Sequence, residues 1–388
     1  MSSYNYREIR TPIFEQSTLF ARSIGELTDI VSKEMYTFLD RGQESITLRP
    51  EGTAAALRAY IQNNLGEQSP LTKLYYVGPM FRQERPQAGR LRQFHQFGAE
   101  AIGSSSPLLD VEMMVLPRDV YLQLSIEEMS LSINSVGCPV CRPKYKTILV
   151  AHLEKVFSKL SPESQARLRQ NPLRVLDSKE EQDRELTKNA PLMKDFLCPE
   201  CSVHFASVTA ILGTLNVPYQ IDGRLVRGLD YYTKTAFEIT STALGSQDAL
   251  AGGGRYDLLV EELGGKPTPG VGFAAGMERL MMVLEKQGQI KSKPLLPLLY
   301  FVALDARSRS WAFVQASALR SKGISIELDY MERSAKAQMR EANRQQAKYV
   351  IVVGESELTT GVARLKNMLT GDEQTIQLEK IEQALIST

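Results

Sequence analysis

The stretch FRQERPQAGRLRQFHQFGAE, residues 81–100, decides the fold because it joins a hairpin pattern to an unusual concentration of polar side chains. Residues 73–84 and 91–103 are strand-like, and the Pro and Gly of RPQAG between them indicate a loop. Four arginines, two glutamates and four glutamines fall within the stretch. The pattern predicts an antiparallel β-hairpin with a strongly polar surface.

The polar residues of this hairpin share faces, since side chains alternate along a strand. Arg82 and Glu84 lie on one face of the first strand, and Gln96 and Glu100 on one face of the second. A charged face is usually solvated. Here phenylalanines occupy alternate positions and can pack behind, while the arginines offer planar donors that suit phosphate. We therefore interpret the polar face as the wall of a cleft.

Two strand-to-helix junctions carry further candidates. In LRPEGT, residues 48–53, Thr53 can cap the following helix, and the carboxylate of Glu51 can accept from a substrate ammonium. In GVGFAAGMERL, residues 270–280, Arg279 falls in the first helical turn, close to the positive end of the helix. A surface ion pair is the simpler interpretation of Arg279, and a receptor for a triphosphate is the functional one.

A third polar region precedes an aromatic strand. In GRLVRGLDYYT, residues 223–233, Arg227 stands beside a glycine and can enter a site without crowding. Strand alternation predicts that Tyr231 and Tyr232 point to opposite faces, one into the core and one toward a ligand. AGGGRYD, residues 251–257, lacks the spacing of a phosphate loop, and its glycines are interpreted as a flat floor under a ligand.

Composition gives broad limits. The chain has 388 residues, a formal net charge of +1 and no apolar window long enough to span a membrane. Its N-terminus lacks the apolar core of a secretory signal, so we expect a cytoplasmic protein. The near-zero net charge excludes a global field that attracts nucleic acid, and a polyanion site must come from local clusters.

The residue patterns predict three parts. Residues 1–137 and 206–288 form an α+β domain, an antiparallel sheet flanked by helices, in which residues 108–124 are a helix broken near Pro117. Residues 138–205 are a helical insertion. Residues 296–388 alternate strands with helices and predict an α/β domain with a mostly parallel sheet.

The four cysteines form two CPxC pairs, one at each end of the insertion: Cys138 and Cys141, then Cys198 and Cys201. In a reducing compartment this grouping favours a metal over disulfides. If the insertion folds back on itself, four thiolates suffice for a tetrahedral Zn²⁺ site, and four free thiols are the open alternative. His204 can join them or be a lone surface histidine.

Taken together, these motifs resemble a known family. FRQERPQAGRLRQFHQ resembles motif 2 of class II aminoacyl-tRNA synthetases, and GVGFAAGMERL resembles motif 3. LRPEGT, GRLVRGLDYYT and GGGRYD narrow the resemblance to the histidyl-tRNA synthetases, in which LVRGLDYY is the histidine-specific signature. It extends from about Tyr4 to the chain end. It implies a class II catalytic domain, an anticodon-binding α/β domain, and activation of L-histidine by ATP with Mg²⁺ before transfer to the 3′ end of tRNA-His.

The resemblance also assigns roles to matching positions. Residues that match Arg82, Glu84 and Arg279 bind ATP in the family, and the one that matches Arg227 replaces a metal ion at the α-phosphate. Arg82 and Arg227 are thus the implied catalytic pair. In the motif 2 loop, Arg85 and Gln87 match residues that meet the tRNA acceptor end. The residues implied to bind histidine are Glu51, Thr53, Arg82, Gln96, Glu100, Arg227, Tyr231 and Tyr232.

Partners follow from the same comparison. YREIRTPIFE, residues 6–15, resembles motif 1, which lies at the dimer interface in the family, and so implies a homodimer. The family normally has a further strand and a long helix before this segment, and these are missing here. Their absence leaves the strength of the dimer open. A basic stripe suited to anticodon phosphates, or simply solvated, is predicted on one tail helix at Lys336, Arg340, Arg344 and Lys348. The alternative function is a catalytically silent paralogue that serves as regulatory subunit of ATP phosphoribosyltransferase.

Overall fold

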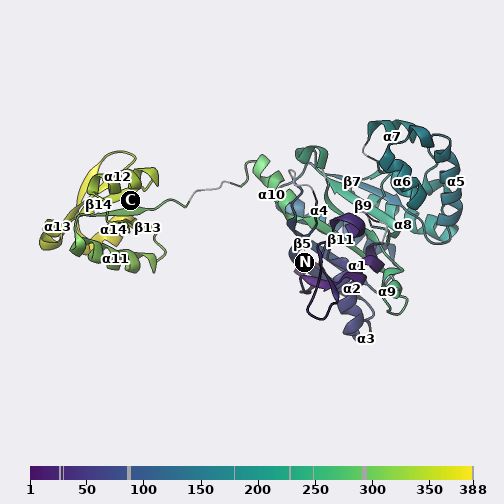
Figure 1. The fold of residues 1–388 in the computed structure, drawn as a ribbon, viewed down its shortest axis with the longest axis horizontal. Coiled ribbons are helices and arrows are strands. Elements are labelled where there is room, and N and C mark those ends of the chain that lie inside the picture. The colour runs from purple at the N-terminus through teal and green to yellow at the C-terminus, as the bar shows by residue number, and fades with distance from the viewer. Residues whose placement is uncertain are drawn as a thin grey trace. The chain divides into compact units, whose positions relative to one another are not determined.

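The computed structural model describes residues 1–25, 28, 30–84, 89–178, 180–226, 229–247, 249–290 and 295–386. The chain divides into two compact units, Met1–Ile290 and Lys291–Thr388, and each is described by itself (Figure 1). Within the described ranges, no helix is long and apolar enough to cross a bilayer.

Among the residues that the structure describes, the first unit is built on an eight-stranded sheet. The central pairs of strands are antiparallel, and the short strand at each edge of the sheet is parallel to its neighbour. β5 and β6 form the predicted hairpin, in register from Thr72 opposite Ile102 to Phe81 opposite Gln93. In spatial order the strands are β1 (Arg7–Glu8), β5 (Thr72–Phe81), β6 (Gln93–Ile102), β11 (Gly270–Gly276), β10 (Ala249–Arg255), β9 (Thr233–Thr240), β7 (Ser130–Ser135) and β8 (Gln220–Ile221).

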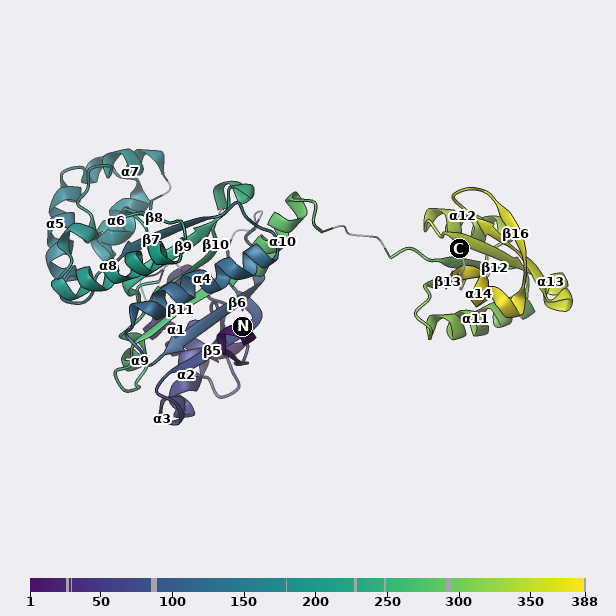
Figure 2. The same ribbon diagram turned by 180° about the vertical axis from the view of Figure 1, so that it is seen from behind.

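Three helices cover one face of this sheet: α4 (Pro107–Gln123), α8 (Pro199–Thr214) and α10 (Met277–Lys286). Figure 2 shows α4 lying along the strands. The predicted break near Pro117 is wrong, because α4 continues through this buried residue. Proline removes one backbone donor, and the packing of the surrounding helix against the sheet offsets that loss.

The opposite face carries a smaller set of elements. Helices α1 (Ser17–Ile24), α2 (Thr53–Gln62), α3 (Leu65–Gln68) and α9 (Leu259–Glu262) accompany a three-stranded sheet of order β2 (Phe14–Gln16), β4 (Ser45–Leu48) and β3 (Thr37–Leu39). Neighbouring residues of β6 divide between the two faces, since Ala101 packs in the core with α4 and Ile102 in the core with α2. The sheet is therefore buried on both sides.

The segment between β7 and β8 is helical, as expected for an insertion. It contains α5 (Arg142–Glu154), α6 (Pro162–Gln170), α7 (Glu181–Leu186) and α8, around its own apolar core. At one end of that core, the hydroxyls of Ser161, Ser164 and Ser178 all donate to Oδ2 of Asp183. These bonds hold the pKa of the Asp183 carboxyl below its usual value, against the opposing effect of burial.

The second unit is a five-stranded sheet of order β13 (Ile326–Leu328), β12 (Leu299–Ala303), β14 (Tyr349–Val353), β15 (Val362–Asn367) and β16 (Glu373–Gln377). β13, β12 and β14 are parallel, whereas β15 and β16 are antiparallel. Its helices are α11 (Ala306–Arg320), α12 (Ala335–Arg344), α13 (Glu355–Thr360) and α14 (Ile381–Ile386).

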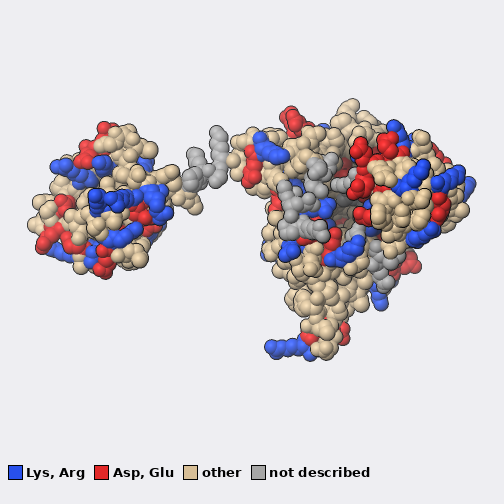
Figure 3. Space-filling model, turned by 45° about the horizontal axis from the view of Figure 1, so that its top comes forward, with Lys and Arg blue, Asp and Glu red and all other residues tan. Residues whose placement is uncertain are grey.

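The basic stripe of the second unit is shorter than predicted. Lys336, Arg340 and Arg344 are exposed on α12, but the helix ends at Arg344 and Lys348 lies beyond it. Lys348 Nζ lies 4.9 Å from the centroid of the Tyr349 ring. On the face seen in Figure 3, Lys and Arg side chains gather over part of this unit, with acidic side chains beside them.

Candidate active site

A pocket opens over the polar face of the β5–β6 hairpin, where strands β10 and β11 and the start of α10 meet it. This arrangement confirms that the polar face borders a cleft, while Phe97 packs in the core behind it. The sequence-predicted residues that line the pocket are Glu51, Thr53, Arg82, Glu84, Gln96, Tyr231, Tyr232 and Arg279. Arg85, Gln87 and Arg227 lie outside the described residues.

Arg82 is held in place at the end of the first hairpin strand. Its Nε donates to the carbonyl of Pro50 at 3.0 Å, and its guanidinium carbon lies 5.4 Å from the centroid of the Phe94 ring. Nη1 lies 4.0 Å from Oε1 of Glu84, and Arg90 Nε lies 3.3 Å from the other oxygen of the same carboxylate. The guanidinium is therefore orientated before any ligand binds.

Arg279 projects into the pocket from the first turn of α10, as predicted. Its Nε donates to the carbonyl of Gly89 at 3.2 Å and its Nη1 to that of Ala249 at 2.8 Å. Burial lowers the pKa of Arg279, and the nearby Arg90 and Arg82 charges lower it further. Three guanidinium groups thus gather in one pocket, where they raise the local affinity for a polyanion.

At the turn before α2, the residue that caps the helix is Glu51 and not Thr53. The carboxylate of Glu51 accepts from the backbone N–H groups of Thr53, at 2.6 Å, and Ala54, at 2.9 Å, and so caps α2. The predicted Thr53 cap is wrong, because its hydroxyl donates to Glu100 Oε1 at 2.7 Å instead. Burial raises the pKa of Glu51, and the backbone donors oppose this rise.

Glu100 lies fully buried beside the pocket and is not among the residues that line it. Its carboxylate accepts from the hydroxyls of Thr53 and Tyr76 on one oxygen and of Tyr256 on the other. Burial raises its pKa to about 8, although the three hydroxyl donors act in the opposite direction. Space for it depends on Gly272, where an added Cβ would lie 1.8 Å from Oε2.

Tyr76 and Tyr256 were missed in the sequence. Tyr256 belongs to the GGGRYD motif, in which only the glycines indicated a ligand surface. Tyr76 sits in the first hairpin strand, two residues from Leu74, which stands opposite Glu100. The same-face spacing along the strand, applied backwards from Arg82, is the signal that places Tyr76 on the polar side.

Tyr231 and Tyr232 do not point to opposite faces, so that prediction is wrong. Both are buried, their ring centroids lie 4.7 Å apart, and both line the pocket. Strand alternation does not apply because β9 begins only at Thr233. The pair forms an aromatic wall, and Tyr231 meets Tyr256 edge to face at 5.9 Å.

The glycines of the floor serve two purposes. Gly252 lines the pocket, in agreement with the interpretation of the AGGGRYD glycines as a flat surface, and Gly272 of β11 lines it as well. Gly253 faces the neighbouring strand, where an added Cβ would lie 2.2 Å from the carbonyl oxygen of Gly272. At the edge of this floor, Gln96 Oε1 is buried without a hydrogen-bond partner among the described residues. It is an acceptor available to a ligand donor.

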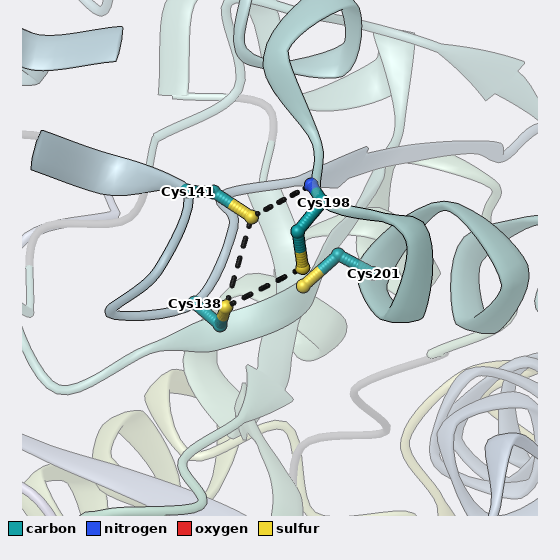
Figure 4. A group of neighbouring side chains, drawn as sticks. All are labelled: Cys138, Cys141, Cys198 and Cys201. Atoms are coloured by element: carbon teal, nitrogen blue, oxygen red, sulfur yellow. Dashed lines mark hydrogen bonds between the residues drawn. The ribbon is translucent and has the colours of Figure 1, made fainter. Parts of the chain in front are cut away.

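The four cysteines meet where the insertion joins the sheet (Figure 4). Their Sγ atoms all lie within 4.8 Å of one another. Cys138 Sγ lies 3.6 Å from Cys141 Sγ and 3.8 Å from Cys198 Sγ, and the backbone N–H of Cys198 donates to Cys141 Sγ at 3.1 Å. Tetrahedral Zn²⁺ with bonds of about 2.3 Å places its sulfurs about 3.8 Å apart, so these residues fit the ion.

His204 takes no part in this group of thiols. Its Nε2 lies 3.0 Å from Oδ1 of Asp110, and Asp110 in turn pairs with the fully buried Arg255 at 2.6 Å. The prediction of a lone surface histidine is therefore wrong, because His204 is 8% exposed. From α8 its ring reaches Asp110 on α4.

The fold and the pocket together define a class. An antiparallel sheet with an arginine-lined pocket beside its hairpin, a helical insertion and a separate α/β unit form the arrangement of a class II aminoacyl-tRNA synthetase. A family model described as "Histidyl-tRNA synthetase" matches residues 1–280, and one described as "Anticodon binding domain" matches residues 305–388. The chain belongs to the histidyl-tRNA synthetase family.

Individual relatives agree with this assignment. A histidine--tRNA ligase of Halothermothrix orenii is 51% identical over 97% of this chain and 90% of its own length, and one of Desulforamulus reducens is 49% identical with the same coverage. The crystal structure of apo S. aureus histidyl-tRNA synthetase superposes with a TM-score of 0.73 and 40% identity. That match covers 99% of this chain and 92% of the other.

Proposed function

We propose that this protein activates L-histidine with ATP and transfers it to the 3′ end of tRNA-His. The observation that carries the proposal is the convergence of Arg82, Arg90 and Arg279 on one pocket whose other wall holds buried tyrosines and carboxylates. The arginines suit a triphosphate, and the tyrosines and carboxylates suit an amino acid with a polar side chain. Relatives at about half identity are named for the same reaction.

In the proposed first step, a carboxylate oxygen of histidine attacks the α-phosphorus of ATP, and the bond to the bridging oxygen of pyrophosphate breaks. The attacking group is already ionised, so no protein base is needed. Alignment and spread positive charge lower the barrier. We assign that charge to Arg82 and Arg227 at the α-phosphate and to Arg279 at the terminal phosphates, with Glu84 toward the adenine.

ATP use by synthetases of this class implies Mg²⁺, which neutralises phosphate oxygens when it is bound. Glu278, which lines the pocket and accepts from the backbone N–H of His95 at 2.9 Å, is a carboxylate of the kind that this hard cation takes. In the second proposed step the terminal tRNA hydroxyl attacks the histidyl carbonyl and AMP leaves. Arg85 and Gln87 are proposed to meet the tRNA end on the strength of the sequence resemblance alone.

For histidine itself, we infer a pocket between the hairpin and the aromatic wall. Gln96 with its unpaired Oε1, together with Glu51 and Thr53, is assigned to the α-amino group. Glu100 and Tyr232 are assigned to the imidazole, with Tyr231 as a supporting wall. A substrate without imidazole N–H groups would forgo the hydrogen bonds offered at this end of the pocket, at a cost of about 1–3 kcal/mol.

Histidine-dependent exchange of pyrophosphate into ATP tests this proposal. We expect exchange with L-histidine and none with L-phenylalanine, which matches it in shape but lacks the ring N–H groups. Charging of tRNA-His transcript then tests the second step. A protein without histidine-dependent exchange would be the silent regulatory paralogue instead, a function that the named relatives do not favour.

Assembly and domain limits are part of the same proposal. We infer a cytoplasmic homodimer that uses the motif 1 region and the small sheet to which it belongs, where Phe14 on β2 and Phe38 on β3 expose apolar rings. We also infer a catalytic domain at residues 1–137 and 206–288, an insertion at 138–205, and an anticodon-binding domain at 296–388.

We further propose that the four cysteines bind a structural Zn²⁺. Purified protein should contain about one zinc equivalent per chain, since four thiolates complete a closed tetrahedral site. Cys198→Ser should lose most of the metal and lower the thermal midpoint of the first unit, because metal binding contributes to folding. Ser202→Ala, a change on the same helix outside the group, is the control. Metal content far below one equivalent in fresh preparations would reject the site.

A further inference from the structure

The cysteine group lies on the backbone that leads to the aromatic wall of the pocket. Beyond β7, Val136 N–H donates to the carbonyl of Lys234 at 2.7 Å, and Lys234 N–H donates to that of Gly137 at 2.9 Å. The chain then turns so that the N–H groups of Cys141 and Arg142 both donate to the carbonyl of Cys138, at 3.0 and 3.1 Å. This turn is therefore tied to the start of β9, next to Tyr232.

Arg142 is the first residue of α5 and follows directly on the ligand candidate Cys141. Its Nε donates to the carbonyl of Val136 at 3.0 Å, and its Nη2 donates to the carbonyl of Tyr232. One guanidinium thus joins the end of β7 to the backbone of a residue that lines the pocket. The side chain keeps this position only if the turn from Cys138 to Cys141 is fixed.

A metal ion at the cysteines would fix that turn and attract the guanidinium of Arg142. Two sulfurs of the turn and two from the start of α8 would be joined through one ion, which prevents α5 from moving away from the sheet. Zn²⁺ with four thiolates carries a net charge of −2, the sum of +2 and −4. Arg142 would then stand beside a negative centre, which attracts its guanidinium.

We propose that Arg142 is a positioning residue for the amino-acid pocket, and that the four-cysteine metal centre sets the affinity for histidine through it. The inference rests on the zinc site and the histidine pocket proposed above. It assigns the metal a second effect beyond holding the insertion together. Tyr232 is the point at which that effect reaches the substrate, since its carbonyl is held by Arg142 and its ring borders the pocket.

The test compares wild type and Arg142→Met, each with zinc bound and after zinc removal by a chelator. Pyrophosphate exchange gives the KM for histidine and for ATP, and metal analysis with a colorimetric chelator gives zinc content and release rate. In the wild type, zinc removal should raise the histidine KM about tenfold, the size expected for loss of a charge-assisted hydrogen bond. The ATP KM should change little.

Arg142→Met should show the raised histidine KM with zinc still bound, release zinc faster, and respond little to zinc removal. The two changes act on one contact and should not be additive. Arg142→Lys keeps the charge with a single donor group and should recover part of the affinity. Lys146→Met, an exposed position on the same helix, is the matched control and should behave as wild type.

The outcomes separate the proposals. Protein that never carries zinc overturns the metal centre and this inference together, and the metal analysis identifies that case. Zinc-loaded Arg142→Met with an unchanged histidine KM overturns this inference alone. An equal rise in the KM of histidine and ATP, or additive effects of mutation and zinc removal, also overturns it, since either result indicates general loosening. Absence of exchange by the zinc-loaded wild type overturns the proposed activity and, with it, this inference.

Discussion

Replacement of Arg82 by alanine should lower the rate of histidine-dependent pyrophosphate exchange by about 100- to 1000-fold, the usual effect of removing one preorganised group that stabilises transition-state charge. Arg82 is orientated by the Pro50 carbonyl and by the Phe94 ring, so its charge is already in place when the α-phosphate passes through its most negative state. Steady-state exchange at saturating ATP and histidine measures the effect.

Two further variants sharpen this prediction. Arg82→Lys keeps the charge but not the planar fork, and it should fall between alanine and wild type. Arg92→Ala removes an exposed arginine from the same hairpin and should leave exchange nearly unchanged. If Arg82→Ala keeps exchange within a few-fold of wild type while remaining folded, the assignment of Arg82 to the reacting phosphate is wrong.

Replacement of Glu100 by glutamine should change how stability depends on pH. Burial raises the pKa of Glu100 to about 8 in the folded protein, whereas an unfolded glutamate titrates near 4.3. Between those values the folded state keeps a proton that the unfolded state has lost. The free energy of unfolding therefore falls as pH rises, by about 1.4 kcal/mol per pH unit from this group. Glutamine does not titrate and lacks this slope.

The measurement is the difference between the two proteins in urea unfolding of the first unit, from pH 5 to pH 8. Glu100→Gln should gain stability relative to wild type with each step upward in pH. Glu261→Gln removes an exposed carboxylate and controls for the loss of charge alone. If the difference in the free energy of unfolding between the two proteins stays constant across this range, Glu100 titrates alike in the folded and unfolded states. It then does not hold a proton in the folded pocket.

Local patterns predicted much of this fold and site. The polar pattern of the hairpin predicted a cleft wall with Arg82 and Glu84, and both line the pocket although β5 ends at Phe81, just before them. The strand–glycine–helix pattern predicted Arg279 in the first turn of α10, where the structure has it. The Arg279 prediction succeeds because it depends on the regular geometry of one helix.

The errors occur where a neighbour in space decides the outcome. Thr53 does not cap α2 because Glu100, brought close by strand pairing, accepts its hydroxyl. Tyr231 and Tyr232 precede their strand, and Pro117 is tolerated by packing that no local rule contains. His204 is drawn inward by Asp110 and Arg255, residues far away in the sequence. Such contacts depend on the assembled sheet.

The pairing of β6 with β11 at the centre of the large sheet has a consequence for how the protein is made. Ile102 pairs with Gly270, so this contact closes a loop that contains the whole insertion. Closing a loop costs entropy that grows with its length, and an insertion that collapses first shortens the effective loop. During synthesis the sheet cannot be completed until β11 has left the ribosome. We therefore expect the free edge of β6 to stay unpaired until β11 emerges, and the free edge of β10 to stay unpaired from its own emergence until then.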